Sequence, residues 1–340
     1  MTKLPADLEN RTRKPSEKKV ALAEARRSTF RDPSAYQPDP DLVDAMRVAL
    51  LLRKPLLVTG EPGTGKTDLG RYLAWKCGFL FFQFDSKSTS VARDLHYYYD
   101  ALGRFQASQS GGSADASQFL RLNALGEAIL QSRAFAEIPA DMRHVLPPDF
   151  EHTGPRQSVV VIDEVDKAPR DFPNDLLNEL ENHYFRIAEL GVRPVRAGNG
   201  LEPVLVITSN SEKNLPAPFL RRCVYYNIEF PSDSKGLRNR LREIVAARLP
   251  EFDDENETAP PMLRDVLEVF ELLRRDASGL TKKPATAELL DWLVGMLELG
   301  GEVDMGLDDE LARRTIPALV KHATDRVAAL TVLKDWFARK

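Results

Sequence analysis

Short apolar runs alternate with helically spaced apolar residues through the first two thirds of the chain. Between Asp41 and Leu52, apolar residues recur every three or four positions, which is the spacing of an amphipathic helix. Strand-length apolar runs follow, most of them separated by segments with helical spacing; they are 55–58, 80–84, 159–162, 204–208 and 224–230. Uninterrupted apolar runs are typical of strands buried on both faces. The pattern therefore predicts an α/β fold with a five-stranded parallel sheet flanked by helices.

The pattern changes after Pro231, because no later run has the character of a buried strand. Helical spacing continues instead, interrupted by an acidic linker and by turns that contain glycine or proline. The expected helices are 237–249, 262–275, 286–299 and 310–336. We therefore expect an α/β domain over 36–231 and an all-helical domain over 232–340.

Charge sets the first 35 residues apart from the rest of the chain. The first 31 residues hold nine Lys or Arg against four acidic residues, whereas the whole chain has a formal charge of −4. We expect residues 1–35 to form a basic, flexible arm, which is either a solvated tail or a docking segment.

Composition excludes several classes of protein. The two cysteines, Cys77 and Cys223, are too few for a disulfide framework or a zinc site with four sulfur ligands, and this predicts a reducing compartment. No apolar stretch reaches the roughly 20 residues that a membrane span needs. We expect a cytoplasmic protein without a membrane span.

A phosphate-binding loop follows the first apolar run directly. Its residues are Gly60, Glu61, Pro62, Gly63, Thr64, Gly65, Lys66 and Thr67. In this pattern the glycines let backbone N–H groups surround phosphate oxygens, and the next helix contributes its positive end. Lys66 then bridges the outer phosphates and the Thr67 hydroxyl can bind Mg²⁺. A nucleoside triphosphate site is the prediction.

Two acidic residues, Asp163 and Glu164, end the run 159–162. The carboxyl ends of parallel strands meet at one rim of the sheet, so these side chains should lie beside the phosphate loop. Asp163 is expected to hold Mg²⁺, directly or through water, and Glu164 to orient and deprotonate an attacking water.

Two further features lie near the ends of the last strands. The run 204–208 is followed by Asn210, whose amide could position water beside the terminal phosphate, although asparagine at a strand end is usually a turn residue. Arg221 and Arg222 precede the run 224–230. Each arginine is either a surface cation or a source of positive charge for phosphoryl transfer. Such charge is often supplied to the site of a neighbouring subunit.

Together the motifs GEPGTGKT, VVVIDE, ITSN and LPAPFLRRC resemble those of AAA+ ATPases, and most of all the MoxR-like group, whose helix 2 carries an insertion. The resemblance covers roughly residue 36 to the end of the chain. It implies a P-loop AAA+ fold with a helical lid, ATP and Mg²⁺ as cofactors, and a hexameric ring with ATP between subunits. By position it implies Walker A roles for Lys66 and Thr67, Walker B roles for Asp163 and Glu164, a sensor 1 role for Asn210 and a finger role for Arg222. Arg221 departs from the usual aspartate, which leaves open which arginine reaches ATP.

The resemblance also implies two hairpin insertions facing the ring axis, near 91–109 and 184–200. Tyr97 to Tyr99 would lie on the first ribbon, with Ala101 to Gly103 near its turn; the alternative is that these tyrosines cover the core sheet. The expected sensor 2 arginine is missing, since Ala285 occupies its position. Either Lys282 or Lys283 replaces it, or sensing from the lid is weakened.

These features predict an ATPase that converts ATP and water to ADP and phosphate and uses the energy to remodel or mature a partner protein. The family resemblance implies a von Willebrand A domain protein as that partner. An alternative is an ATPase motor or regulator acting on nucleic acid, for example in a defence system, through Arg104, Arg186, Arg193 and Arg196. The acidic body of the chain argues against that alternative. A nucleotide-gated scaffold without turnover is the third interpretation.

Overall fold

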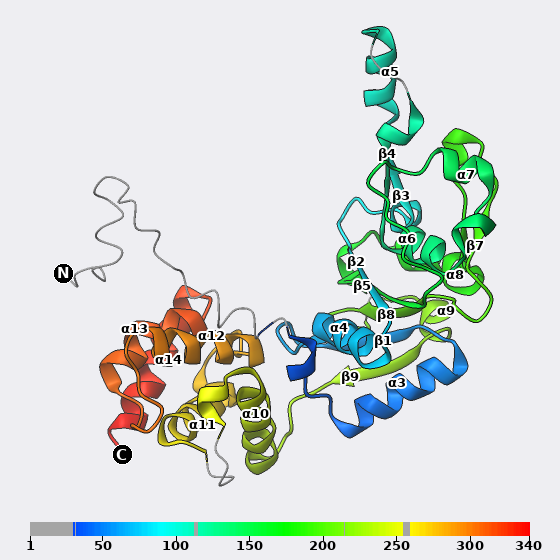
Figure 1. The fold of residues 1–340 in the computed structure, drawn as a ribbon. Helices are drawn as coiled ribbons and strands as arrows, with labels where there is room; N and C mark the ends of the chain where they lie inside the picture. Colours follow the sequence, from blue (N-terminus) through cyan, green and yellow to red (C-terminus); the bar gives the residue numbers. More distant parts are fainter. Residues whose placement is uncertain (1–29, 31, 112–114, 214, 254–258) are drawn as a thin grey trace.

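The computed structural model describes residues 30, 32–111, 115–213, 215–253 and 259–340. Most of the expected basic arm therefore lies outside the described residues. The described chain forms a sheet-containing body and a separate group of helices, with a slender extension that rises from the body at α5 (Ala101–Gln109; Figure 1).

The body contains the five-stranded parallel sheet that the apolar runs predict. Its strands are β1 (Leu56–Gly60), β2 (Leu80–Asp85), β5 (Ser158–Asp163), β8 (Val204–Thr208) and β9 (Val224–Ile228). They lie in the order β2-β5-β8-β1-β9, and every neighbouring pair is parallel. The strand that leads into the phosphate loop is thus placed between β8 and β9. This order agrees with the P-loop AAA+ fold that the resemblance implies.

Helices cover both faces of this sheet because successive strand residues point to opposite sides. On one face, Leu56 and Val58 pack with the helices α3 (Pro40–Leu52) and α4 (Lys66–Cys77). On the other face, Leu57 packs in a core that includes α6 (Ala124–Gln131) and α8 (Phe172–Asn182). The remaining short helices of the body are α7 (Ala140–His144) and α9 (Ala217–Leu220).

The first insertion is longer than the sequence suggested. Strand β3 (Tyr97–Tyr99) pairs antiparallel with β4 (Leu120–Leu122), so the ribbon closes well beyond residue 109. Ala101–Gln109 forms the helix α5 rather than a tight turn, because the Asp100 side chain accepts a hydrogen bond from the Gly103 N–H and caps it. Tyr97 is buried, whereas Tyr98 is 54% exposed.

A second antiparallel ribbon lies between α8 and β8. It consists of β6 (Tyr184–Phe185) and β7 (Val195–Arg196), within the segment where the second insertion was expected. Phe185 stacks on His96, which attaches this ribbon to the base of the first one.

The C-terminal region is helical, as predicted, and has its own apolar core around Trp292. Its helices are α10 (Ser234–Arg248), α11 (Pro261–Arg274), α12 (Thr286–Glu298), α13 (Asp309–Leu319) and α14 (Ala323–Phe337). The single helix expected over 310–336 was wrong. The chain breaks at Val320–His322, soon after Pro317, whose ring removes a backbone donor from α13, and α14 then packs against α11 and α13.

The helical region meets the body along a cleft at the carboxyl ends of the strands, where Phe230 and Pro231 connect the two. No helix in the described part of the chain combines the length and the apolar character that a membrane crossing requires.

Candidate active site

The phosphate loop lies between β1 and α4, where the sequence places it. Gly63 and Gly65 have φ angles of 82° and 85°, a region that favours glycine, and they turn the backbone back on itself. The Thr64 hydroxyl donates to the Glu61 carbonyl at 2.8 Å and braces the turn. Because α4 begins at Lys66, its free N–H groups face the loop, which is the arrangement that binds phosphate oxygens.

The Lys66 ammonium lies at the centre of the loop and is 7% exposed. It donates to the carbonyls of Gly60 and Glu61 at 2.8 and 2.9 Å and to Asn210 Oδ1 at 3.2 Å. Burial lowers the pKa of Lys66, while nearby carboxylates, that of Asp166 foremost, oppose the shift. A buried cation surrounded by carbonyl oxygens can exchange these partners for phosphate oxygens.

Asp163 ends β5 next to the first turn of α4. The Thr67 hydroxyl donates to its two carboxylate oxygens at 3.0 and 2.9 Å, and the Thr208 hydroxyl donates at 2.5 Å. These contacts bring Thr67 and Asp163 together across 96 residues of sequence. Mg²⁺ prefers such oxygen ligands and usually takes one or two from the protein and the rest from phosphate and water. Within the described residues no group of three or more His, Cys, Asp or Glu side chains forms a metal site, so the pair fits Mg²⁺ only together with a nucleotide.

Glu164 has a left-handed backbone, with φ of 52° and ψ of 52°, immediately after β5. Its N–H donates to the Thr208 hydroxyl at 2.8 Å, which fixes this unusual conformation. Its carboxylate lines the cavity described below and forms an ion pair with Lys167. The side chain is 40% exposed, so water can reach it.

Asn210 reaches the same rim from the end of β8. Its backbone N–H and its amide Nδ2 both donate to the Asp166 carboxylate, at 3.1 Å each, while its Oδ1 accepts from Lys66. Asp166 therefore orients the amide, a contact that the sequence analysis did not predict. The missed signal was the position of an acid three residues after Asp163, where the short helix Val165–Lys167 turns it back toward the rim.

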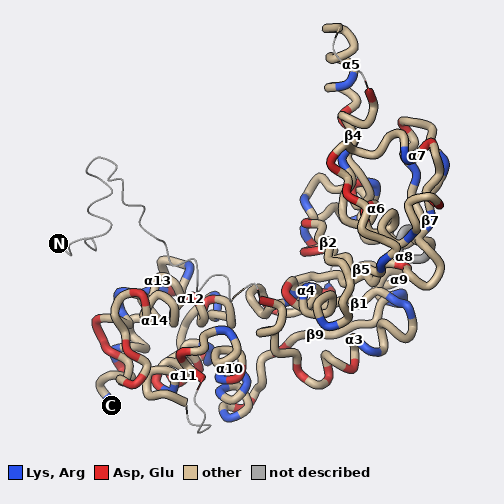
Figure 2. The backbone as a smooth tube through the Cα atoms, viewed as in Figure 1, with Lys and Arg blue, Asp and Glu red and all other residues tan. Residues whose placement is uncertain are grey.

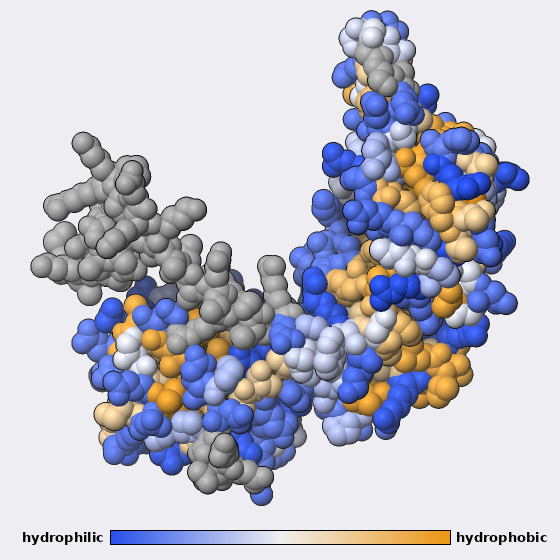
Figure 3. Space-filling model, viewed as in Figure 1, coloured by the Kyte–Doolittle hydropathy of each residue, from blue (hydrophilic) through white to orange (hydrophobic). Residues whose placement is uncertain are grey.

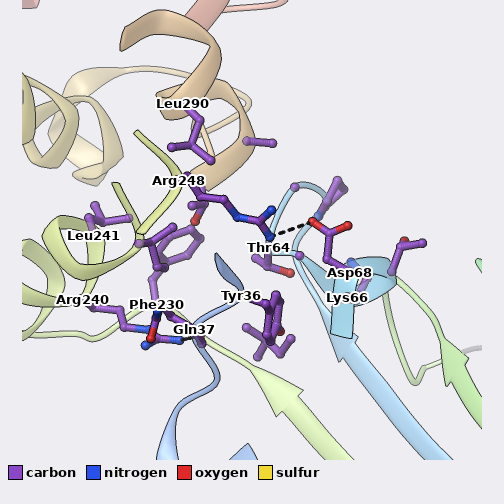
Figure 4. Close-up of a pocket in the computed structure, with 18 of the residues that line it drawn as sticks. Tyr36, Gln37, Thr64, Lys66, Asp68, Phe230, Arg240, Leu241, Arg248 and Leu290 are labelled. Carbon is purple, nitrogen blue, oxygen red and sulfur yellow. Dashed lines mark hydrogen bonds and ion pairs between the residues drawn. The ribbon is translucent and has the colours of Figure 1, made fainter. Parts of the chain in front are cut away.

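A cavity of about 520 Å³ extends from the phosphate loop into the cleft below the lid. Aromatic and aliphatic side chains line its far end, including Tyr36, Phe230 and Leu290 (Figure 4). Apolar and aromatic walls next to a phosphate cradle suit a nucleoside whose flat base needs a partner to pack against.

Two arginines of α10 reach this cavity. Arg248 is 5% exposed and pairs with Asp68 at 3.4 Å across the cleft (Figure 4). It also donates to the backbone carbonyl of Asp32 at 3.2 Å. Arg240 donates to the carbonyl of Gln37. Burial raises the pKa of Asp68 and Arg248 opposes that shift, so the ion pair helps to keep the carboxylate charged.

The lid also touches the phosphate loop directly. The Ala287 N–H, at the start of α12, donates to the Gly63 carbonyl at 3.1 Å. Arg274 pairs with Glu61 at 3.0 Å, and its guanidinium lies 3.8 Å from the centre of the Phe230 ring. The position of the lid is thus coupled to the conformation of the loop.

Neither lysine suggested as a sensor 2 substitute lines the cavity. Lys283 pairs with Asp276 at 2.5 Å, and the backbone N–H of Lys282 donates to Asp325 at 3.0 Å. Ala285 caps α12 without a polar side chain. The lid cations that line the cavity are Arg240 and Arg248, from a different helix.

Arg221 and Arg222 lie at the opposite end of the sheet, just before β9 begins at Val224. They do not line the cavity that holds Lys66. Arg222 donates to the Pro218 carbonyl at 3.2 Å. Among the predicted site residues, the structure therefore gathers Lys66, Thr67, Asp163, Glu164 and Asn210 at one rim and leaves both arginines away from it.

Comparison with known proteins agrees with this architecture. The profile of the family described as "ATPase family associated with various cellular activities (AAA)" matches residues 56–232, which is just over half of the 340-residue chain. No curated protein matches the sequence significantly. Among solved structures, the chain is similar to the RuvB Holliday junction branch migration motor of Thermotoga maritima, with 14% identity and a TM-score of 0.43, over 84% of this chain and 69% of that one.

Proposed function

This chain belongs to the AAA family of ATPases, and we propose that it is a magnesium-dependent ATPase of the MoxR-like group that assembles into a hexameric ring and remodels a partner protein. The observation that carries the proposal is the rim itself. Lys66 begins α4, and Asp163, Glu164 and Asn210 meet it from the carboxyl ends of β5 and β8. Hydrolysis of a bound triphosphate needs a cation, a metal ligand, a base and a polar group for water at such a rim.

The chemistry assigned to these residues is an in-line attack of water on the terminal phosphorus. Glu164 accepts the proton of that water as the new oxygen–phosphorus bond forms, and the bond to the β-phosphate oxygen breaks to release ADP. To do so, the Glu164 carboxylate exchanges its ion pair with Lys167 for the water. Mg²⁺ held at Thr67 and Asp163 supplies positive charge to the phosphate oxygens.

The position of the arginines supports the proposed ring. Arg222 lies at the end of the sheet away from its own cavity, so it can reach a terminal phosphate only in another copy of the chain. Stabilising charge from a neighbouring subunit is a common device in phosphoryl transfer. We assign this trans role to Arg222, with Arg221 as the alternative.

The partner would meet the first insertion. Helix α5 extends away from the body, and it carries Leu102 and Phe105, which are 66% and 61% exposed (Figure 1). Exposed apolar side chains on a protruding element are typical of a protein contact. We propose a von Willebrand A domain protein as the partner, as the MoxR-like resemblance implies.

Three of the four residues suggested for nucleic-acid binding, all but the exposed Arg186, are engaged in local contacts. Arg193 pairs with Asp141 at 3.4 Å, Arg104 donates to the Tyr99 hydroxyl at 2.7 Å, and Arg196 lies 4.9 Å from the centre of the Tyr184 ring. A protein partner is therefore the better supported function. Stimulation of ATP hydrolysis by DNA, with strong salt dependence, would reverse this preference.

Replacing Glu164 by Gln tests the proposal. The variant should bind ATP with nearly unchanged affinity, while steady-state phosphate release falls by about 10²- to 10⁴-fold because the general base is lost. Glu302→Gln, at an exposed lid position, is the matched control. Full turnover by Glu164→Gln would refute the assignment, and absence of phosphate release from the wild-type protein would favour the scaffold interpretation.

The same variant can capture the partner. With ATP bound and hydrolysis blocked, Glu164→Gln rings should retain a von Willebrand A domain protein from the same cells. Replacing Leu102 and Phe105 by Ser should abolish that retention without changing basal phosphate release. Retention that is unaffected by this double change would place the contact elsewhere.

A further inference from the structure

Two pairs of basic residues lie side by side at the end of the sheet where strands β1 and β9 begin. Arg53 and Lys54 precede β1, and Arg221 and Arg222 precede β9. Leu56 is paired with Val224, and the Val224 N–H donates to the Pro55 carbonyl at 2.8 Å. This register sets Lys54 opposite Arg222, on segments whose strands are about 4.8 Å apart.

These residues line one surface hollow of about 520 Å³, which is separate from the nucleotide cavity. Its charged and polar lining consists of Arg53, Lys54, His183, Glu202, Arg221 and Arg222. Figure 2 shows the corresponding blue segments at the end of α3 and near α9. Four cationic side chains thus face a single carboxylate.

The single carboxylate does not neutralise the hollow. Glu202 pairs with Arg53 at 3.6 Å. Burial lowers the pKa of His183, so its imidazole is neutral at pH 7 and adds no charge to the hollow. Within the described residues, neither the Lys54 ammonium nor the Arg221 guanidinium has an ion pair or a side-chain hydrogen bond. Neighbouring cations repel one another, so the hollow is suited to an anionic occupant.

The backbone fixes the direction of the first basic pair. Arg53 ends α3 in a left-handed conformation, with φ of 51°, and its N–H donates to the carbonyls of Ala49 and Leu50. The Lys54 N–H donates to Ala49 as well, at 3.1 Å. These hydrogen bonds at the end of the helix restrict the conformation of the Lys54 backbone.

An apolar patch adjoins the hollow on the last turns of α3. Val48, Leu51 and Leu52 are 43%, 82% and 58% exposed. Figure 3 shows apolar side chains over this end of α3, at the lower right of the molecule. Exposed leucines beside a cationic hollow are typical of a protein interface and are not expected around a site for a free anion or a nucleic-acid backbone.

We propose that this hollow receives the nucleotide rim of a second copy of the chain, and that Lys54 acts beside Arg222 on the terminal phosphate bound in that copy. The cavity at that rim is complementary in charge, because six carboxylates of the described residues line it against the three cations Lys66, Arg240 and Arg248, and ATP adds further negative charge. The site for hydrolysis is then composite: the base and the metal ligand come from one copy, and at least two cations come from the next. This inference rests on the proposed ATPase ring, and it adds Lys54 to the residues that act between subunits.

Replacing Lys54 by Gln is the first test. Turnover per subunit should fall by about tenfold through kcat, while ATP affinity stays within about twofold, because the lost charge acts on the neighbour's transition state and does not touch the nucleotide of its own subunit. Lys334→Gln, an exposed lysine on α14, should match the wild type in both quantities. Thermal unfolding of both variants checks that the fold is unchanged. Loss of ATP affinity in Lys54→Gln, or an unchanged kcat, would overturn the proposal.

Mixed assemblies separate a trans role from a cis role. Lys54→Gln subunits keep their own base, and Glu164→Gln subunits keep their own lysine, so a mixture should be more active than either variant alone. In randomly mixed rings at equal ratio, about a quarter of the interfaces combine the two intact halves. No recovery on mixing would show that Lys54 does not act between subunits.

Arg222→Ala distinguishes failure of this inference from failure of the proposed function. If Arg222→Ala abolishes turnover while Lys54→Gln does not reduce it, the ring stands and the role of Lys54 is refuted. If the wild-type protein does not hydrolyse ATP, Arg222→Ala has no turnover to abolish. The proposed function then fails, and the composite site fails with it.

Discussion

Asp166 offers a sharp test of the active-site geometry, because only the structure connects it with the nucleotide rim. Its carboxylate accepts two hydrogen bonds from Asn210, from the backbone N–H and from Nδ2, at 3.1 Å each. It is also the strongest of the charges that hold the pKa of Lys66 up against burial. Replacing Asp166 by Ala removes both effects while leaving Asn210 and Lys66 in place.

The expected magnitude follows from these contacts. A hydrogen bond to a charged group contributes about 1.5 to 3 kcal/mol when buried, and partial exposure reduces that value. We take about 2 to 3 kcal/mol for the pair, which corresponds to a fall in kcat of about 30- to 150-fold if the Asn210 amide is needed in place. Asp166→Asn keeps one acceptor oxygen, so its kcat should lie between those of the wild type and Asp166→Ala.

The pH dependence gives a second signature. ATP binding relies on the charged form of Lys66, so affinity is present below the pKa of Lys66 and is lost as pH rises through it. The pKa of Lys66 is already lowered by burial, and removal of the Asp166 charge lowers it further. The alkaline loss of ATP affinity in Asp166→Ala should therefore begin at a lower pH than in the wild type.

Steady-state phosphate release and equilibrium binding of ATP measure these quantities. Asp171→Asn, a nearby exposed acid, is the control. In a double-mutant cycle, Asp166→Ala and Asn210→Ala should be strongly non-additive, because one acts through the other. Additive effects, or a kcat for Asp166→Ala within about twofold of the wild type, would refute the positioning role.

Two further predictions concern the cleft and the metal. Arg248→Ala should raise the KM for ATP by about tenfold. Arg248→Lys should restore only part of the ATP affinity, because lysine cannot bond to Asp68 and to backbone carbonyls at the same time. Equal affinity of both variants and the wild type for a fluorescent nucleotide would contradict this prediction. Chelation of Mg²⁺ should stop hydrolysis while ATP remains bound, and Asp163→Ala should raise the Mg²⁺ concentration for half-maximal turnover. Unchanged Mg²⁺ dependence in that variant would remove Asp163 from the metal site.

Much of the fold could be predicted because the local signals were strong. The five apolar runs all became strands of one parallel sheet. The central strands β1, β5 and β8 are buried nearly throughout, which leaves few alternatives for such runs, whereas the edge strands β2 and β9 are only partly buried. The phosphate loop was placed between β1 and α4 because glycine spacing and strand context agree there. The break between α13 and α14 escaped prediction, because helical apolar spacing continues across it and Pro317 alone was a weak stop signal.

The sequence by itself determined which chemical groups this protein has and which strand ends they follow. Lys66, Asp163 and Asn210 were identified in this way, because the carboxyl ends of parallel strands meet at one rim whatever the loops between them do. Only the tertiary structure decided the partners of those groups. The contact of Asp166 with Asn210, the ion pair of Arg248 with Asp68 across the cleft and the position of Lys54 opposite Arg222 depend on strand register and on how the lid is placed. These features bring together residues that are tens to nearly two hundred positions apart in the sequence. No local sequence pattern predicts which of such distant residues meet.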